Sequence, residues 1–376
     1  MSNKNLLSGR DKELQELAEQ YEAAMAESKP FYQDADELAD LADWYGTRKR
    51  YNKAFEIAEY GLKLHPDSTE LMIEYAYLHL DNGKKAKARE IIENLPDTYS
   101  PEAKVVRAHL LLSEGKLDDA EQLLDTIEDK ADLANVVDVS YMYLDMGYPD
   151  KALAWLDPVK EEYSDEEVYI AVVADCLYGK GMTEEAIPLY NRLIDMNPYS
   201  APYWFGLARC HFEEMNFNQA IDACDYALVG DDEFADAYVM KGHCFYQLGN
   251  EDAALEHYQK AEELHGLAPE FIYTYIGLCK VSKGEWKEGY ENLEKAILEN
   301  ETDEVASPIL PSLYANAGLC LSKMGKKRKA HQYCKKAHKL SPEEPESLLI
   351  EGRIYIEEGD YDKGIKQWAK ALDCSP

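Results

Sequence analysis

The chain has no long hydrophobic stretch and few basic residues relative to acidic ones. Its 376 positions contain no run of about 18 apolar residues, so no membrane-spanning helix is predicted. The opening residues, MSNKNLLSGRDKELQEL, lack the apolar stretch of a signal peptide, which makes the cytoplasm the expected location. Only 40 Lys and Arg stand against 73 Asp and Glu, for a net charge of −33. A surface of that sign disfavours nucleic acid and anionic membranes as partners.

Motifs that carry catalysis or bind metals are also missing. The sequence has no glycine-rich phosphate loop, no HExxH and no GxSxG, and its cysteines never occur as CxxC or CxH. Cys210-His211 and His243-Cys244 suggest a zinc site, but on alternating helix faces His211 and His243 would point to opposite sides. We therefore predict that the protein is not an enzyme and has no cofactor and no metal.

A period of 34 residues runs through most of the sequence. Gly318 and Gly352 are 34 residues apart, and so are Ala337 and Ala371. Within each period, apolar residues recur at helical spacing on both sides of a turn that usually contains Gly. Repetition at this period predicts stacked helix pairs, each too small to bury its apolar face alone.

Ten repeats can be laid out from the recurring small residues. They begin near Ala35, Thr69, Pro101, Leu133, Glu167, Ala201, Ala235, Glu270, Pro311 and Pro345. Units such as PYWFGLARCHFEEMNFNQAIDACDYAL and LLIEGRIYIEEGDYDKGIKQWAKALDCSP resemble the tetratricopeptide repeat family, whose signature combines aromatic residues, Leu-Gly, Ala and a closing Pro. The resemblance covers residues 35–376. It implies an all-α, right-handed superhelical solenoid of antiparallel helix pairs, whose first helices line a concave groove that holds peptides or partner helices.

The segments outside the regular repeat predict three further features. Residues 1–34 contain an amphipathic stripe and are expected to form a capping helix and lead-in to the solenoid of residues 35–376. The stripe consists of Leu14, Leu17, Ala18, Tyr21 and Met25. The stretched spacing near residues 300–312 predicts a longer loop. Pro158 and Pro188 fall inside second helices and predict local kinks.

Five cysteines occupy the tenth position of successive repeats, namely Cys176, Cys210, Cys244, Cys279 and Cys320. Equivalent positions on stacked helices lie at least about 8–10 Å apart, whereas a disulfide needs Cα atoms within about 7 Å. We interpret these cysteines as small buried hydrophobic residues in a reducing compartment.

We assign one face of each first helix to the groove, because helical spacing places certain residues of that helix on the same side. The assigned residues are Asp36, Asp40, Asp43, Glu70, Glu74, Tyr77, Asp138 and Tyr141 in the N-terminal repeats, Tyr178, Phe205, Phe212, Tyr246 and Phe271 in the middle, and Tyr275 and Asn316 towards the C-terminus. An acidic, Tyr-lined groove should favour basic or aromatic-rich segments. The alternative is that the aromatic residues belong to the core and the acids are simply solvated.

Asn316 also tests a known binding mode of the family. Family members that bind a C-terminal carboxylate have Lys and Asn on one repeat, an Asn such as this one on the next, and Lys and Arg on a third. Here the flanking positions hold Thr274, Leu278, Glu346 and Ile350, so this clamp is not expected.

One repeat carries the opposite charge. Residues 311–342 contain no Asp or Glu but seven Lys and one Arg. The predicted basic surface consists of Lys326, Lys327, Arg328, Lys329, Lys335, Lys336 and Lys339. It could bind an acidic partner or the acidic end of a second copy, or neighbouring acids such as Glu301 and Glu343 could neutralise it.

The sequence thus predicts a non-enzymatic scaffold or adaptor that binds a protein segment in its groove. The alternative is a regulatory receptor for a short peptide that changes the pitch of the superhelix on binding. Ile365 and Leu372 face away from the last repeat, and either remain on the surface or contact another chain.

Overall fold

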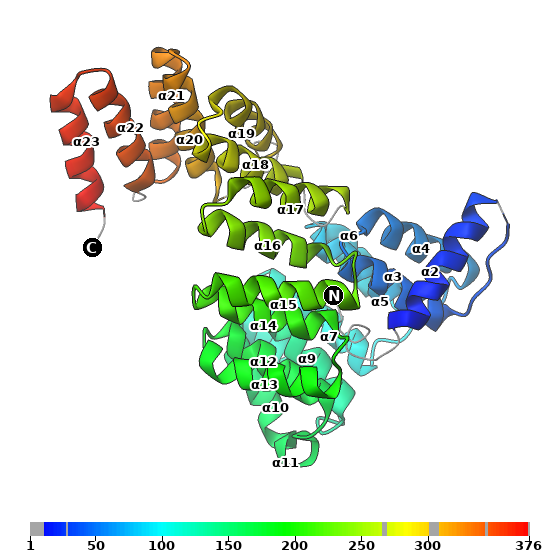
Figure 1. Ribbon diagram of the computed structural model, residues 1–376. Coiled ribbons are helices and arrows are strands. Elements are labelled where there is room, and N and C mark those ends of the chain that lie inside the picture. Colours follow the sequence, from blue (N-terminus) through cyan, green and yellow to red (C-terminus); the bar gives the residue numbers. More distant parts are fainter. Residues whose placement is uncertain (1–10, 28, 265–268, 301–307, 343–344, 375–376) are drawn as a thin grey trace. The chain divides into compact units, whose positions relative to one another are not determined.

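The structure is a computed structural model that describes residues 11–27, 29–264, 269–300, 308–342 and 345–374 (Figure 1). Within these ranges it is helical and has no strand. The first helices of the repeats are α3 (Ala35–Thr47), α5 (Thr69–Asp81), α7 (Pro101–Ser113), α9 (Leu133–Asp145), α12 (Glu167–Gly179), α14 (Ala201–Glu213), α16 (Ala235–Gln247), α18 (Pro269–Ser282), α20 (Leu310–Lys323) and α22 (Pro345–Glu357). The second helices are α4 (Tyr51–Leu64), α6 (Lys85–Glu93), α8 (Leu117–Leu124), α10 (Pro149–Leu156), α13 (Thr183–Met196), α15 (Phe217–Gly230), α17 (Glu251–Glu263), α19 (Trp286–Asn300), α21 (Lys327–Leu340) and α23 (Tyr361–Asp373).

The first helices begin where the repeat predicts them. Eight of the ten begin at the residue read from the sequence, while α18 and α20 each begin one residue earlier. Side-chain caps fix several of these starts. Ser68 and Ser100, for example, accept hydrogen bonds from the backbone N–H groups of Leu71 and Ala103. The all-helical solenoid of paired helices is confirmed.

Turns between paired helices depend on a left-handed backbone position. Gly181 joins α12 to α13 with φ of 73°, and Gly359 joins α22 to α23 with φ of 85°. Residues with a Cβ rarely adopt this conformation, which explains the regular glycine. Both turns lie where the sequence predicts a break between helices.

Close packing of adjacent helices, both between repeats and inside a pair, depends on a glycine beneath an aromatic ring. A Cβ built on Gly206 would lie 2.2 Å from Cε1 of Tyr190, and one built on Gly242 would lie 2.5 Å from Cε1 of Tyr258. Both tyrosine rings are almost completely buried. The glycine lets the two backbones approach, and the ring fills the space that remains.

The helix α2 (Asp11–Ala26) covers the first repeat, as the amphipathic stripe predicts. Leu14, Ala18 and Tyr21 are buried in one cluster with residues of α3 and α4, and Leu17 and Met25 pack against its edge. The predicted lead-in at residues 1–10 lies outside the described residues.

The two prolines act differently. At Pro158 the second helix is interrupted: α10 ends at Leu156, and a 3₁₀ turn (η1, Asp157–Val159) leads into α11 (Lys160–Tyr163). Pro188 lies inside α13, which continues through it from Thr183 to Met196. Most of the predicted long loop, residues 301–307, lies outside the described residues.

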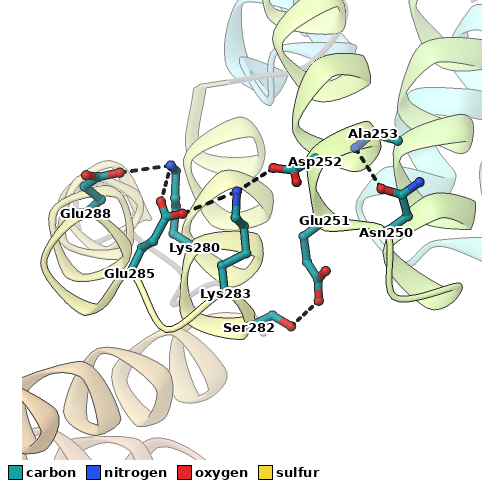
Figure 2. Close-up of polar contacts among 9 residues, drawn as sticks. All are labelled: Asn250, Glu251, Asp252, Ala253, Lys280, Ser282, Lys283, Glu285 and Glu288. Atoms are coloured by element: carbon teal, nitrogen blue, oxygen red, sulfur yellow. Dashed lines mark hydrogen bonds and ion pairs between the residues drawn. The ribbon is translucent and has the colours of Figure 1, made fainter.

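The chain divides into two compact parts, residues 1–234 and residues 235–376. Polar side chains join successive helices within the second part (Figure 2). Lys283, in the turn after α18, reaches Asp252 on α17 at 2.5 Å and Glu285 at 3.3 Å. Ser282 donates a hydrogen bond to Glu251 across the same two helices at 2.6 Å. These contacts tie one repeat to the next.

The predicted burial of the cysteines is confirmed. Cys176, Cys210, Cys244, Cys279 and Cys320 are fully buried free thiols. Burial raises the pKa of each to about 12, so all five remain protonated and unreactive near neutral pH. Among the described residues, no helix is both long enough and apolar enough to cross a membrane.

Candidate functional site

A cavity of about 350 Å³ lies between four successive first helices of the N-terminal part. The helices α3, α5, α7 and α9 supply its walls, together with the loop before α7. Its lining consists of Asp36, Ala39, Asp40, Thr69, Glu70, Ile73, Glu74, Tyr77, Asp97, Ser100, Glu102, Val105, His109, Asp138, Tyr141, Met142 and Asp145. We refer to this site as the acidic cavity. Its volume falls within the range typical of ligand-binding pockets.

The lining is dominated by one charge. Eight of these side chains are carboxylates, and no Lys or Arg is among the described residues that line the cavity. Asp36, Glu70 and Glu102 lie in the first turns of their helices, where the positive end of the helix dipole stabilises a carboxylate. The N-terminal ends of these three helices therefore help to stabilise negative charge in the acidic cavity.

The carboxylates also repel one another. Burial, followed by the charges of Asp43, Asp40 and Asp138, raises the pKa of Glu74 well above its ordinary value. Burial and the charge of Glu70 raise the pKa of Asp36. Such shifts mean that a bound cation would relieve an unfavourable concentration of like charge.

Apolar and aromatic groups form the rest of the lining. Ile73, Val105 and Met142 are buried, as are the rings of Tyr77 and Tyr141. A cation beside such surfaces can place its aliphatic stem on apolar atoms and its charge near an aromatic face.

One buried polar group of the cavity has no partner. His109 is only 7% exposed, and its Nδ1 has no hydrogen-bond partner among the described residues. Burial lowers the pKa of His109 to about 4, so the ring is neutral near pH 7. An unsatisfied buried nitrogen in a pocket wall is costly unless a ligand or water reaches it.

Most of the predicted N-terminal groove residues meet in this cavity. Seven of the eight line it, namely Asp36, Asp40, Glu70, Glu74, Tyr77, Asp138 and Tyr141. The exception is Asp43, which is 3% exposed and does not line the cavity. Asp43 is one turn beyond Asp40 on the same helix face, and there the side chain passes into the packed interior.

The middle aromatic residues of the first part surround an ion pair instead of an open groove. Arg209 on α14 bonds Asp175 on α12 at 2.7 Å, and its guanidinium lies 4.4 Å from the ring centroid of Tyr178 and 5.5 Å from that of Phe205. Tyr190 donates to the same carboxylate at 2.7 Å. Another predicted groove residue, Phe212, packs edge-on against Phe217 at 5.5 Å.

The predicted groove residues of the second part are largely engaged in packing. Tyr275 stacks on Tyr258 at 5.0 Å, and Tyr246 packs against the same cluster. Asn316 donates hydrogen bonds to the backbone of Ser312 and to Glu346 at 3.1 Å. Phe271 is the most open of these side chains, at 38% exposed. None of these residues lines the acidic cavity.

The predicted basic residues all lie on or beside one helix and are all exposed. They are Lys326, Lys327, Arg328, Lys329, Lys335, Lys336 and Lys339, and they belong to α21 and the residue before it. Lys329 approaches Glu294 at 3.6 Å and donates to the hydroxyl of Tyr290 at 2.7 Å. The acids expected to neutralise this surface, including Glu301 and Glu343, lie outside the described residues.

Among the described residues, no group of three or more His, Cys, Asp or Glu side chains is placed to hold a metal ion. His243 instead shares a hydrogen bond with the hydroxyl of Tyr258 at 2.8 Å.

Several lining residues were not predicted, although the repeat contains their signal. Glu102 and His109 occupy in α7 the positions that Glu70 and Tyr77 occupy in α5, 32 residues earlier in both cases. Applying the same register to the third repeat would have identified both. Asp97 lies in a loop, where helical periodicity gives no signal.

Comparison with known proteins agrees with the fold. Residues 47–100 and 311–344 each match the tetratricopeptide repeat family, and residues 179–261 match "Anaphase-promoting complex, cyclosome, subunit 3". The chain is a tetratricopeptide repeat protein. Repeats of this family are generally non-catalytic, and those of this chain form a scaffold of the protein-interaction type.

The relatives of this tetratricopeptide repeat protein are distant. A rice protein, "DnaJ protein P58IPK homolog B", is 24% identical over 170 residues, which cover 43% of this chain and 36% of the relative. The yeast "Heat shock protein STI1" is 23% identical over 171 residues, which cover 38% of this chain and 28% of the relative. The chain therefore spans about a third of the length of the curated relatives it matches.

Solved structures share the fold at low sequence identity. A chain of the APC/C hetero-tetramer Cut9–Hcn1 matches with a TM-score of 0.54 and 18% identity, covering 100% of this chain and 81% of that one. A tetratricopeptide repeat protein from Parabacteroides merdae matches with a TM-score of 0.50 and 16% identity, covering 65% and 93%. At these identities the likeness shows the fold alone.

Proposed function

We propose that the acidic cavity binds a basic segment of a partner protein. The observation that carries this proposal is the lining itself, in which eight carboxylates surround buried apolar and aromatic groups. Lys and Arg side chains have the matching parts, a long apolar stem and a cationic head. Aromatic residues of the segment could pack on Ile73, Val105 and Met142.

Two features support a ligand at this position. Burial and then the charges of neighbouring carboxylates raise the pKa of Glu74, and a bound Lys or Arg would relieve the repulsion among these carboxylates. The unpartnered Nδ1 of His109 offers a further hydrogen-bonding group in the wall. Because the cavity is built from helices, little ordering of the scaffold opposes binding.

The test is a fluorescence anisotropy titration with a fluorescein-labelled (Lys-Gly)₅ peptide. The cavity variant carries Glu70→Gln, Glu74→Gln and Glu102→Gln. A matched control carries Glu93→Gln, Glu128→Gln and Glu162→Gln, which changes the net charge equally at other sites of the first part. Three exposed or half-exposed charge contacts at about 0.5 kcal/mol each predict binding about tenfold weaker in the cavity variant.

The control variant should bind within about twofold of the wild type. Equal weakening in both variants would mean that overall charge attracts the peptide, and the cavity would then have no special role. Circular dichroism must show that both variants keep their helix content. Small-angle X-ray scattering with and without peptide distinguishes a rigid scaffold from the alternative receptor, since only the receptor becomes more compact on binding.

A further inference from the structure

The second surface of interest has the opposite charge and lies in the other part of the chain. It is the exposed face of α21, which carries Lys327, Arg328, Lys335 and Lys339 and is preceded by Lys326. None of these five cations forms an ion pair within 4.0 Å with any described residue. We call these five residues the α21 basic face.

Other cations of the same part are neutralised locally. Lys280 contacts Glu285 and Glu288, the second at 2.9 Å, and Lys283 bridges Asp252 and Glu285 (Figure 2). On α23, Lys363 pairs with Asp360 at 2.6 Å. The repeat containing α21 has no acid with which to do the same, because residues 311–342 contain no Asp or Glu.

Tyrosines fix two neighbouring lysines along the edge of this face. Lys329 lies 5.1 Å from the ring centroid of Tyr290 and 5.3 Å from that of Tyr333. Lys336 lies 4.7 Å from the ring centroid of Tyr314 and donates to its hydroxyl at 3.0 Å. A lysine held on an aromatic ring has lost part of its side-chain freedom before any partner arrives.

The spacing of the remaining cations defines a stripe. Arg328, Lys335 and Lys339 are separated by seven and four residues, so they project from one side of the helix. At about 1.5 Å per residue the stripe is about 17 Å long, which matches about five residues of extended chain.

We propose that the α21 basic face binds a short acidic segment of a partner protein. Charge complementarity is the reason: five exposed cations, none of them ion-paired with a described residue, lie on a chain whose net charge is −33. A short acidic segment can end where the stripe ends. A nucleic acid carries one phosphate about every 1.7–3.4 Å along its whole length, so it would extend beyond the stripe onto acidic surface, which would repel it. A second copy of the chain would bring a net charge of −33, which the net charge of the first copy would repel.

The test uses a fluorescein-labelled Gly-(Glu)₈-Gly peptide in an anisotropy titration. The face variant carries Arg328→Gln, Lys335→Gln and Lys339→Gln. The matched control carries Lys287→Gln, Lys366→Gln and Lys370→Gln, three exposed cations of the same part. With each exposed pair contributing about a factor of two, the face variant should bind about tenfold more weakly and the control within about twofold of wild type.

Several outcomes would overturn the proposal. The first is that the wild type does not bind the Glu peptide, and the second is that both variants weaken its binding equally. The third is that a labelled ten-nucleotide poly-dT strand binds the wild type more tightly than the Glu peptide does, and that the face variant abolishes this binding. Concentration-dependent dimers in light scattering, lost only in the face variant, would identify a second copy as the occupant instead. The acidic-cavity variant should bind the Glu peptide as the wild type does, so this test is independent of the proposed function.

Discussion

Replacing Gly242 by alanine should destabilise the repeat that contains α16 and α17. A Cβ at this position would lie 2.5 Å from Cε1, 2.7 Å from Cδ1 and 2.9 Å from Cζ of Tyr258. The ring cannot easily move away, because it stacks on Tyr275 at 5.0 Å and its hydroxyl shares a hydrogen bond with His243 at 2.8 Å.

The magnitude follows from two opposing effects. Alanine is favoured over glycine inside a helix by about 1 kcal/mol. Overpacking a filled core costs about 1–3 kcal/mol, and displacing the Tyr258 hydroxyl from its partner costs about 1 kcal/mol more. The net expectation is a loss of about 2 kcal/mol. Repeat arrays can open locally, so this loss should appear first in α16 and α17.

The assay is amide hydrogen exchange followed by mass spectrometry on peptides from these two helices. A loss of about 2 kcal/mol predicts exchange about 30-fold faster where exchange occurs by local opening. Gly179→Ala is the matched control, because its Cβ would meet Leu144 and Pro149 at an ordinary 3.6 Å. That variant should be unchanged or up to about 0.5 kcal/mol more stable. If Gly242→Ala proved as protected as wild type, packing beneath Tyr258 would not be the reason for glycine.

Three further predictions concern charge and thiols. Asp175→Ala should cost about 2–3 kcal/mol in urea unfolding, because it leaves the largely buried guanidinium of Arg209 unpaired, and a cost near zero would contradict this. The raised pKa of the Glu74 carboxyl means that its ionised form opposes folding. Glu74→Gln should therefore have the melting temperature of the wild type near pH 4 and a higher one as pH rises towards about 8. A difference in melting temperature that stays constant with pH would exclude this linkage. Of the eight cysteines, Cys374 alone should react rapidly with a thiol reagent in native protein, since the other seven are buried.

The fold follows from the sequence because repetition multiplies a weak signal. One helical period near Ala201 would be ambiguous, but the same small residue, turn and aromatic residue recur in register through ten units. Departures from that register are less predictable. Both Pro158 and Pro188 predict kinks, yet Pro158 ends α10 while α13 continues through Pro188. Pro188 is the sixth residue of α13, where it removes one backbone hydrogen bond without ending the helix.

The candidate site is predictable only in part, because periodicity locates a side chain without revealing its partners. The ninth residue of successive first helices is Tyr77, His109, Tyr141, Asp175 and Arg209. Three of them line the acidic cavity, whereas the last two bind each other. Whether an equivalent position faces a ligand or closes an ion pair depends on its neighbour one repeat away, and that neighbour varies from repeat to repeat.

This pairing also limits where negative charge can act. Arg209 neutralises Asp175 in the repeat that follows α9, so the carboxylates of the acidic cavity come from the repeats that contain α3, α5, α7 and α9. Four first helices spaced at about 10 Å span about 30 Å, which corresponds to about nine residues of extended chain. A single cation would neutralise only one or two of the eight carboxylates, whereas a segment with alternating basic residues could reach several of them together. Under the proposed function, a basic peptide would therefore neutralise more of these carboxylates than a single small cation could.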